Sequence, residues 1–430
     1  MTIHMNKILY SILILGTALS MQSCLHDEDE VFDTSADQRL QQAVSTNREV
    51  LESAQNGWVM HYYTGRNYTG GGYSLLMKFK DGKAQIASDN TGSEVATSSY
   101  TITKEQGPVL AFDTYNTVMH SFSAVSISDV DGDQGDDEFI IQKISQDKDT
   151  IWVEGHKWGN KMEMTRLPEG TSWQNYLNSL SKIKDDMWYS YKVMNGQDSL
   201  AQVMLNPDTR RITVTNGTTT YSSPYYVTPT GIGFPNQVIL GKNKTKKLTW
   251  SATDSLMTVD GSSEQLRFFA PEGWHPIEYY AHNWRFYYNN WKGDLKLFCK
   301  KISGTKIEGS FTGTDGLTYK VILTYNKAYG SLSWLVQDME DPSGTYDHLQ
   351  LMAIYTDPSS RSEYITWAPG VGLEWKLSNG SFVLVDNGKL GGATVSGFVI
   401  DGVDASGNRA NAYPVLIENF TGAYAYPYSE

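Results

Sequence analysis

Trp58-Val59-Met60-His61-Tyr62-Tyr63 enters a turn region at Thr64–Gly72, from which Tyr73 to Phe79 leads to Asp81-Gly82 and then to Lys83 to Ala87. These segments are rich in aromatic and apolar residues that suit a pleated sheet. Asp-Gly is a strong signal for a tight turn between two antiparallel strands. The stretch therefore predicts consecutive strands joined by turns. Further short strands are predicted at 99–104, 109–113, 121–127, 138–145, 150–155 and 161–166.

The predicted strands follow one another without intervening helices, which favours a meander that closes as a sandwich or a small barrel. Composition agrees, because the 430 residues include 27 tyrosines, 12 tryptophans and 38 glycines. Tyr and Trp favour half-buried pleated surfaces, and glycine is common at turns and bulges. We therefore expect a mainly β protein of sandwich-like or barrel-like modules, with the lipocalin-like barrel as one form.

A helix is predicted before the first strand, from about residue 36 to 55. Ser35 and Gln38 have the spacing of a capping box, and Gly57 lies where a glycine ends many helices. Apolar side chains at helical spacing give this segment one face for a core. The residues of that face are Ala36, Leu40, Ala43, Val44, Leu51 and Ala54.

A second unit repeats this order. Thr171-Ser172-Trp173-Gln174 resembles a helix start, and Trp188–Val193 follows it as a strand-like run. The two units also end alike, at Leu167-Pro168-Glu169-Gly170 and at Ala270-Pro271-Glu272-Gly273. This common order indicates a duplication. The predicted boundaries are 34–170 for a helix and β module, 171–273 for a second helix and β module, and 274–430 for a C-terminal β module.

The first 23 residues have the pattern of a signal peptide. Lys7 supplies a positive start, and Ile8 to Leu19 is an apolar run too short to span a bilayer. Ser23 then precedes Cys24, which is the pattern at which lipoprotein signal peptidase cleaves before a diacylglyceride is attached to the thiol. We expect 1–23 to be removed, Cys24 to carry lipid, and 24–33 to form an acidic tether. An ordinary secreted protein is the alternative.

Charge limits the partners of the mature chain. Residues 1–23 contain Lys7 and no carboxylate, so their removal leaves 34 basic and 48 acidic residues. A net negative chain has no electrostatic attraction to nucleic acid or to anionic lipid headgroups. Attachment to a membrane would therefore depend on the lipid at Cys24, and two or three acyl chains give a stable anchor.

The C-terminal module has turn signals at Asp315-Gly316, Asp386-Asn387-Gly388 and Asp401-Gly402. Cys24 and Cys299 are the two cysteines, so lipid on Cys24 leaves Cys299 without an intramolecular disulfide partner. Cys299 lies in an alternating run, Lys296–Lys300, and we predict that it is a buried thiol.

Several motifs together resemble one family. They are the cysteine with its acidic tail, the helix that runs into Asn56-Gly57-Trp58, Gly72-Tyr73, and Gly135-Asp136-Asp137-Glu138-Phe139. They are similar to a domain-of-unknown-function family of Bacteroidetes lipoproteins, best over 24–170, fairly to 273 and weakly beyond. Members tend to accompany TonB-dependent, starch-utilisation-type uptake systems. The resemblance implies a lipoprotein on the outer face of the outer membrane that assists nutrient capture, and it supplies no catalytic residues.

The segment 129–138 places six carboxylates within ten residues. Calcium prefers several hard oxygen ligands, so Asp129, Asp131, Asp133 and Asp136 form a candidate calcium loop. The segment departs from an EF-hand, because its sixth position is Gln134 and no helices flank it. A solvated hairpin loop is the alternative. No other cofactor is expected.

An aromatic strand is the leading candidate for a ligand-binding surface. In 284–291 alternation places Trp284 and Tyr288 on one face and Tyr287 on the other, with Trp291 at the end. Flat rings suit the apolar faces of sugars, while neighbouring Asn and Arg side chains could bind hydroxyl groups. A strand buried between two layers is the alternative.

Catalytic motifs are weak in this chain. The histidines lack metal-ligand spacing, and Ser179-Leu180-Ser181-Lys182 lacks the partner motifs of a Ser-x-x-Lys enzyme. We therefore expect a non-catalytic surface lipoprotein that binds glycan or peptide for an uptake system, such as a TonB-dependent transporter complex. A structural or adhesive surface protein and a secreted hydrolase with an unrecognised site are the alternatives.

Overall fold

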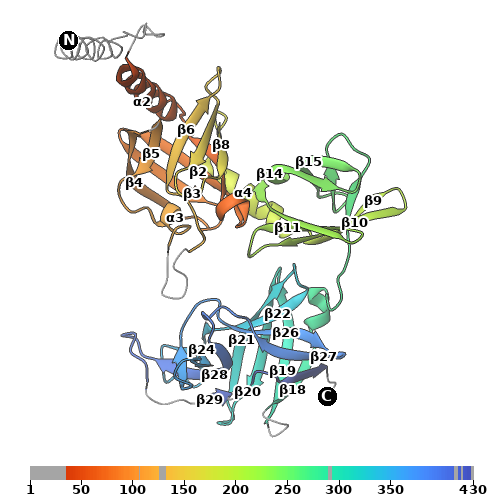
Figure 1. Ribbon diagram of the computed structural model, residues 1–430. Coiled ribbons are helices and arrows are strands. Elements are labelled where there is room, and N and C mark those ends of the chain that lie inside the picture. The colour runs from red at the N-terminus through yellow and green to blue at the C-terminus, as the bar shows by residue number, and fades with distance from the viewer. Residues whose placement is uncertain are drawn as a thin grey trace, which may run out of the picture.

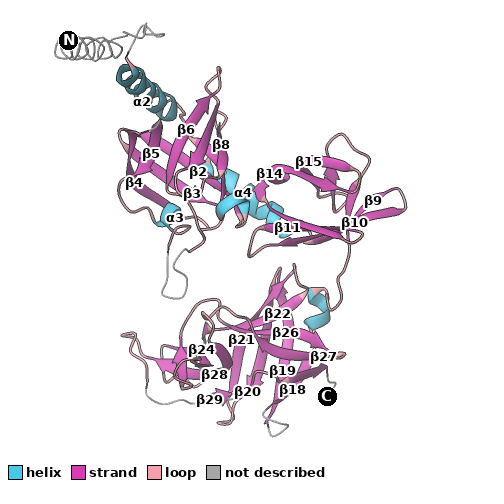
Figure 2. Ribbon diagram, viewed as in Figure 1, coloured by secondary structure: helices cyan, strands magenta, loops and turns pink. Residues whose placement is uncertain are grey.

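The computed structural model describes residues 35–105, 107–124, 132–288, 293–410, 415–417 and 420–427. These residues form three β units that follow one another along the chain (Figure 1), with few helices (Figure 2). The predicted fold class is confirmed, because the first unit is a closed barrel, the second is nearly closed, and the third contains a closed barrel. Within the ranges given above, no helix is both long enough and apolar enough to cross a membrane.

The first barrel is a meander in which each strand pairs antiparallel with the next, and pairing of the first with the eighth closes it. Asp81 and Gly82 form the predicted two-residue turn, and both have the positive φ that a type I′ turn requires. The strands are β1 (Trp58–Tyr63), β2 (Gly72–Lys80), β3 (Lys83–Ser88), β4 (Val95–Lys104), β5 (Pro108–Phe112), β6 (Glu138–Ile144), β7 (Thr150–Gly155) and β8 (Lys161–Arg166).

One predicted strand of this barrel is wrong. In place of a strand beginning at residue 121, the chain forms the short helix α3 (Thr117–His120) and a turn, and 125–131 lie outside the described residues. Asn116 caps this helix, because its side chain accepts a hydrogen bond from Met119 N. Residues 121–123 form a turn directly after this helix, so the described part of the predicted segment is not a strand.

Helix α2 (Ala36–Glu52) lies across one end of the first barrel (Figure 1). The predicted capping box is present, since Gln38 N donates to Ser35 Oγ (3.3 Å) and Ser35 N donates to Gln38 Oε1 (3.1 Å). Leu51 is buried in the barrel core, and its carbonyl accepts a hydrogen bond from Trp58 Nε1 (3.0 Å). The end of the helix is thereby fixed to the start of β1.

The second unit begins with α4 (Trp173–Asp186), and its first and last strands pair as β1 and β8 do. The sheet begins at Ser190, so Trp188 and Tyr189, predicted as strand residues, precede it. The strands are β9 (Ser190–Asn195), β10 (Asp198–Asn206), β11 (Arg211–Asn216), β12 (Thr219–Pro224), β13 (Tyr226–Thr228), β14 (Gly231–Leu240), β15 (Asn243–Ser251), β16 (Leu256–Val259) and β17 (Gln265–Phe268).

β12 and β13 together take the place of a single strand broken at Tyr225. Counted in this way, the second unit has the same eight-strand order as the first. β12 pairs with β11 and β13 pairs with β14, so the break leaves the barrel open between β12 and β14.

The first two units are packed tightly together. The imidazole of His61 stacks on the ring of Tyr226 with centroids 3.7 Å apart, and burial lowers the pKa of His61 to about 4. Ser74 Oγ donates to Val227 O (2.8 Å). Leu76, on the outer face of the first barrel, belongs to the hydrophobic core of the second unit. β13 therefore lies against β2 of its neighbour.

The third unit combines a closed barrel with a five-stranded sheet, whereas the sequence predicts one β module. A short 3-10 helix, η3 (Ile277–Tyr280), leads into the barrel. The barrel strands are β18 (Asn283–Tyr288), β19 (Gly293–Ser303), β20 (Lys306–Thr312), β21 (Thr318–Asn326), β22 (Ser331–Leu335), β26 (Gly372–Ser378), β27 (Ser381–Asp386) and β30 (Tyr424–Pro427). The strands of the other sheet are β23 (Gln337–Met339), β24 (His348–Thr356), β25 (Glu363–Thr366), β28 (Thr394–Val403) and β29 (Val415–Ile417).

The predicted turn at Asp401-Gly402 is wrong, because both residues lie inside β28 and Asp401 is buried. Aromatic rings fill the C-terminal barrel, where Trp284, Trp334 and Trp375 are fully buried. Cys299 is a buried free thiol, as predicted, and burial raises its pKa to about 12.

Candidate functional site

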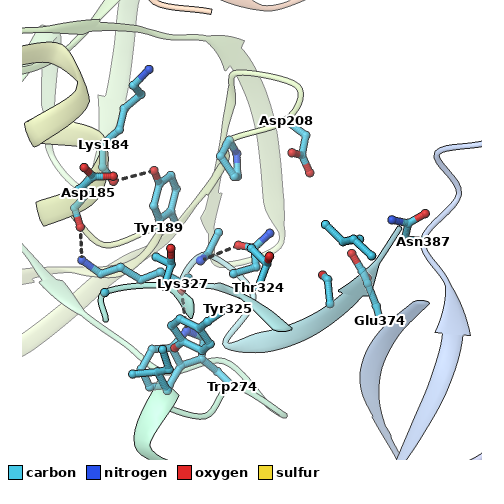
Figure 3. Close-up of a pocket in the computed structure, with 18 of the residues that line it drawn as sticks. Lys184, Asp185, Tyr189, Asp208, Trp274, Thr324, Tyr325, Lys327, Glu374 and Asn387 are labelled. Atoms are coloured by element: carbon cyan, nitrogen blue, oxygen red, sulfur yellow. Dashed lines mark hydrogen bonds between the residues drawn. The ribbon is translucent and has the colours of Figure 1, made fainter. Parts of the chain in front are cut away.

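A cleft of about 800 Å³ lies between the second unit and the C-terminal barrel (Figure 3). This volume is usual for sites that bind small ligands. One wall comes from the end of α4 and the segment that leads into β9, and the other comes from the β21–β22 turn and β26. The lining residues discussed below are Lys184, Trp188, Asp208, Trp274, Lys327 and Glu374.

Lys327 joins the two walls of the cleft. It lies in the β21–β22 turn, and its Nζ donates to Asp185 O and to Asp186 O, both at 2.8 Å. These carbonyls lie at the C-terminus of α4, where a cation also meets the negative end of the helix dipole. The ammonium lies 4.3 Å from the centroid of the Trp188 ring. Burial lowers the pKa of Lys327, while Asp186 and Asp185 act in the opposite direction.

Three aromatic rings form a wall beside this contact. Phe268 lies 4.3 Å from Trp188 and 4.9 Å from Trp274, centroid to centroid. Trp274 Nε1 donates to Lys327 O (2.9 Å), which fixes the indole in place. Gly330 has a φ of +59°, and a Cβ there would lie 2.4 Å from the Trp274 ring. The turn therefore requires glycine both for its backbone conformation and for the space that Trp274 occupies.

Polar groups from both units also line the cleft. Figure 3 shows Asp208 on the second unit and Glu374 with Asn387 on the C-terminal barrel. Tyr329 Oη donates to Asp208 Oδ2 (3.5 Å). Burial raises the pKa of Tyr329 to about 12, and the negative charges of Asp208 and Glu374 act in the same direction. The tyrosine hydroxyl therefore keeps its proton at neutral pH.

Charge in the cleft is biased towards negative. The charged lining residues are Asp185, Asp208, Glu278, Glu374, Lys184, Lys327 and Lys389. Two of the lysines are held by other groups, since Lys327 binds helix carbonyls and Lys184 Nζ donates to Asp89 O (2.7 Å). These bonds occupy the ammonium groups but leave their charge, so four carboxylates against three lysines give the lining a small negative excess, which disfavours anionic ligands.

Lys184 connects the cleft to a buried ion pair at the junction of the first two units. The side chains of Asp89 and Arg210 are 0% and 7% exposed, with Arg210 Nη2 at 3.0 Å from Asp89 Oδ2. The contact between Arg210 Nη2 and Asp89 Oδ2 is an ion pair without the alignment of a hydrogen bond. The other oxygen, Asp89 Oδ1, accepts a hydrogen bond from Ser74 N (3.1 Å). Burial tends to lower the pKa of Arg210, but Asp89 together with the neighbouring tyrosine hydroxyls outweighs it, so the pKa is raised.

Residues 28–252 match a known family, described as a domain of unknown function, DUF4302. The chain belongs to the DUF4302 family. The predicted resemblance to a family of unknown function is confirmed at this level. Comparison with the curated proteins finds none that matches the chain.

The DUF4302 range covers the first barrel and most of the second unit, to just beyond β15. Lys184, Trp188 and Asp208 lie inside it, whereas Trp274 and Lys327 lie beyond it. The cleft is therefore built jointly by the DUF4302 range and the C-terminal unit.

The predicted aromatic surface of the DUF4302 protein needs correction. Trp284 is 0% exposed, because it faces the filled interior of the C-terminal barrel and cannot meet a ligand. Tyr288 packs against the same core and over Gly293. Tyr287 lies on the other face of β18, 6.2 Å from the ring of Tyr426. Trp291 lies outside the described residues.

The candidate calcium loop also changes. The Asp136 carboxylate is buried and accepts hydrogen bonds from Lys157 N (2.7 Å) and Trp158 N (3.0 Å), so it holds a turn of the barrel and is corrected to a structural residue. Burial raises its pKa, while these two bonds act in the opposite direction. Asp133 is exposed at the surface. Asp129, Asp131 and the lipidation residue Cys24 lie outside the described residues.

The cleft residues of the DUF4302 protein are absent from the sequence predictions. Trp188 and Trp274 lie next to the starts of the second and third β units, where the sequence analysis sees only boundaries. Aromatic residues in two successive connecting segments are the signal that could have indicated a site between units.

Proposed function

We propose that this DUF4302 protein is a non-catalytic cell-surface lipoprotein that holds a neutral oligosaccharide for a nutrient-uptake system. The cleft between the second and third units carries the proposal. Trp188 and Trp274 contribute apolar surface to its lining, against which the C–H groups of a sugar can pack. Asp208 and Glu374 provide acceptors for sugar hydroxyl groups.

A neutral ligand is favoured over an anionic one. Carboxylates outnumber the available lysines in the cleft, and the whole chain has a formal charge of −13. An acidic glycan or a nucleic acid would be repelled at long range. A peptide is the second ligand class that would fit the same walls.

The cellular location is proposed from the sequence. Cys24, after an apolar run and before acidic residues, supports attachment of lipid and display on the outer membrane. The resemblance to Bacteroidetes lipoproteins supports an association with a TonB-dependent transporter. In such a setting the cleft would raise the local concentration of a ligand near its transporter.

A hydrolase is the competing proposal, and one observation favours it. Asp208 and Glu374 lie on opposite walls of the cleft (Figure 3), and glycosidases place two carboxylates on either side of the bond that they cleave. An adhesive protein would instead use a surface for other proteins. A binding experiment distinguishes these functions, because a hydrolase would shorten the oligosaccharide and an adhesive protein would not bind it.

Binding to a panel of neutral and acidic oligosaccharides tests the cleft. We expect the wild-type chain to bind a neutral oligosaccharide, and Asp208→Asn with Glu374→Gln to weaken binding by about tenfold or more, because hydrogen bonds to charged groups are lost. Trp152→Ala, on the first barrel, is the control and should bind normally. Calorimetry measures the affinities.

Three outcomes would contradict the binding proposal. They are a wild-type chain that binds none of the sugars, a double variant that binds as the wild type does, and shortening of the oligosaccharide during incubation. The last outcome would assign the cleft to a hydrolase, and the same double variant would then lose that activity.

Removal of the lipid-accepting thiol is the test of location. Cys24→Ala should leave the protein soluble or as an uncleaved precursor, because no acyl chain can be attached. Fractionation of washed outer membranes measures the result, with Cys299→Ala as the matched cysteine control. Recovery of the Cys24→Ala protein in membranes at the wild-type level would contradict lipid attachment at this residue.

A further inference from the structure

The break in the second unit exposes the edges of two strands. β12 pairs with β11 alone in the described chain, and its other edge faces β14 across a gap. A pocket of about 370 Å³ lies in this gap, bordered by Ser222 and Ser223 on one side and by Asn236 and Gln237 on the other. The pocket and the oligosaccharide cleft have no lining residue in common among the described residues.

The register shows which backbone groups of β12 face the gap. β11 and β12 are joined by a two-residue turn that begins with Gly217 (φ 59°), so the closing residues Asn216 and Thr219 bond to each other. Alternation then directs the N–H and C=O groups of Thr220 and Ser222 away from β11. Tyr225 lies an even number of residues after Thr219, so alternation directs its N–H towards β11. Its hydrogen bond to Arg210 O (2.9 Å) supports this assignment.

Pro224 agrees with that alternation. It occupies a position whose N–H would face the gap, so the missing donor costs β12 no ladder bond. Tyr226 of β13 still pairs with Gly233 of β14. Beyond this pair, at Pro224 and Pro235, the two borders of the gap separate. Beyond that point the gap is bordered on both sides by polar backbone.

β14 presents the opposite edge. Leu240 and Asn243 close its hairpin with β15, so alternation directs the carbonyl of Ile239 into the gap. Tyr221 Oη donates to this carbonyl. The tyrosine side chain therefore satisfies an acceptor that a neighbouring strand would otherwise bond.

We propose that the gap between β12 and β14 binds an extended peptide segment of a partner protein, which adds as a strand along β12. The N–H and C=O groups of Thr220 and Ser222 on the β12 border repeat at the spacing of a strand and match the groups of an added one. Thr219–Ser223 is uncharged and rich in β-favouring residues, and protein edges usually carry charges that prevent such pairing. Arg211, the charged residue among the described lining, is engaged with Tyr68 O (2.8 Å) and Gly70 O (2.6 Å).

The first barrel divides the pairing of its corresponding strand in the same way. Residues 95–99 of β4 pair with β3, whereas Tyr100 to Lys104 pair with β5. In the second unit the division falls at Tyr225, where the strand breaks into β12 and β13, and the outer edge of β12 has no ladder partner among the described strands. The turn of the first barrel that includes η2 (Arg66–Tyr68) covers one side of the gap, where Asn67 and Tyr68 both have positive φ.

A displayed library of random short peptides, selected on the full-length mature chain, tests this site. Thr220→Pro removes an N–H that faces the gap and keeps the bonds to β11, whereas Thr220→Val keeps that N–H and is the matched control. We expect selected peptides to bind wild type and Thr220→Val equally, and to bind Thr220→Pro about tenfold more weakly or worse. Binding should also slow hydrogen exchange at the amides of Thr220 and Ser222.

A second measurement keeps the test decisive if Thr220→Pro does not fold. The selected peptide, remade with N-methyl groups at alternate residues, should lose its binding to the wild type because its backbone donors are gone. Retained binding of the methylated peptide, or selection of no peptide, would overturn the proposal. A peptide displaced by the oligosaccharide would belong to the cleft and would overturn it as well.

Discussion

Trp284→Ala should destabilise the C-terminal barrel by about 3–5 kcal/mol, the usual cost of removing a buried aromatic side chain. Trp284 is fully buried, and its ring lies 5.0 Å from that of Trp375 and 5.7 Å from that of Phe382. Its Nε1 also donates to Tyr280 O (3.1 Å), which would lose its donor. The loss is large beside a domain stability of roughly 5–15 kcal/mol.

Urea unfolding of the full-length chain, followed by near-ultraviolet circular dichroism, measures this effect. Tyr287→Ala is the matched control from the same strand, and we expect a change of less than about 1 kcal/mol because this side chain faces away from the core. Equal unfolding of Trp284→Ala and the wild type would show that the barrel interior is not packed as described here.

Arg210→Met should also cause a large loss, of about 3–5 kcal/mol, because it leaves the buried Asp89 carboxylate without its guanidinium partner. Asp89→Asn in the same chain removes the charge but keeps an oxygen for Ser74 N. The double variant should therefore be more stable than Arg210→Met alone. This order is expected because an unpaired buried charge costs more than the loss of both charges.

A double-mutant cycle from chemical denaturation measures the coupling between Asp89 and Arg210. Lys247→Met is a suitable control, because Lys247 pairs with Asp260 at the exposed surface of the second unit. Additive effects of the two single changes would mean that the ion pair does not couple the first two units.

Local features of the fold are well predicted from the sequence. Asp81-Gly82 specifies its own turn, and Ser35 with Gln38 specifies its own helix start, because each signal acts within a few residues. Asp401-Gly402 shows the limit of such signals, since tertiary pairing within β28 overrides them. Alternation also assigns Trp284 to one face of its strand but cannot tell whether that face is core or surface.

The candidate site is harder to predict because it depends on how separate units pack. Trp188 and Trp274 come together only through the docking of the C-terminal barrel, which Lys327 secures. Closure of the first barrel likewise requires β1 to pair with β8, with Trp58 opposite Arg166. Residues so far apart in the sequence leave no local pattern that predicts this pairing. The broken strand at Tyr225 is visible only when the pairing of β12 and β13 is known.

The contact of β13 with the first barrel has a consequence for the order of folding. Chains begin to fold from the N-terminus during synthesis, so the first barrel can close while the second unit is still emerging from the ribosome. It then presents a finished surface, including Ser74 and Leu76, to β13, which pairs with a strand of its own unit on one edge only. The closed barrel thus acts as a template on which its open counterpart completes its fold.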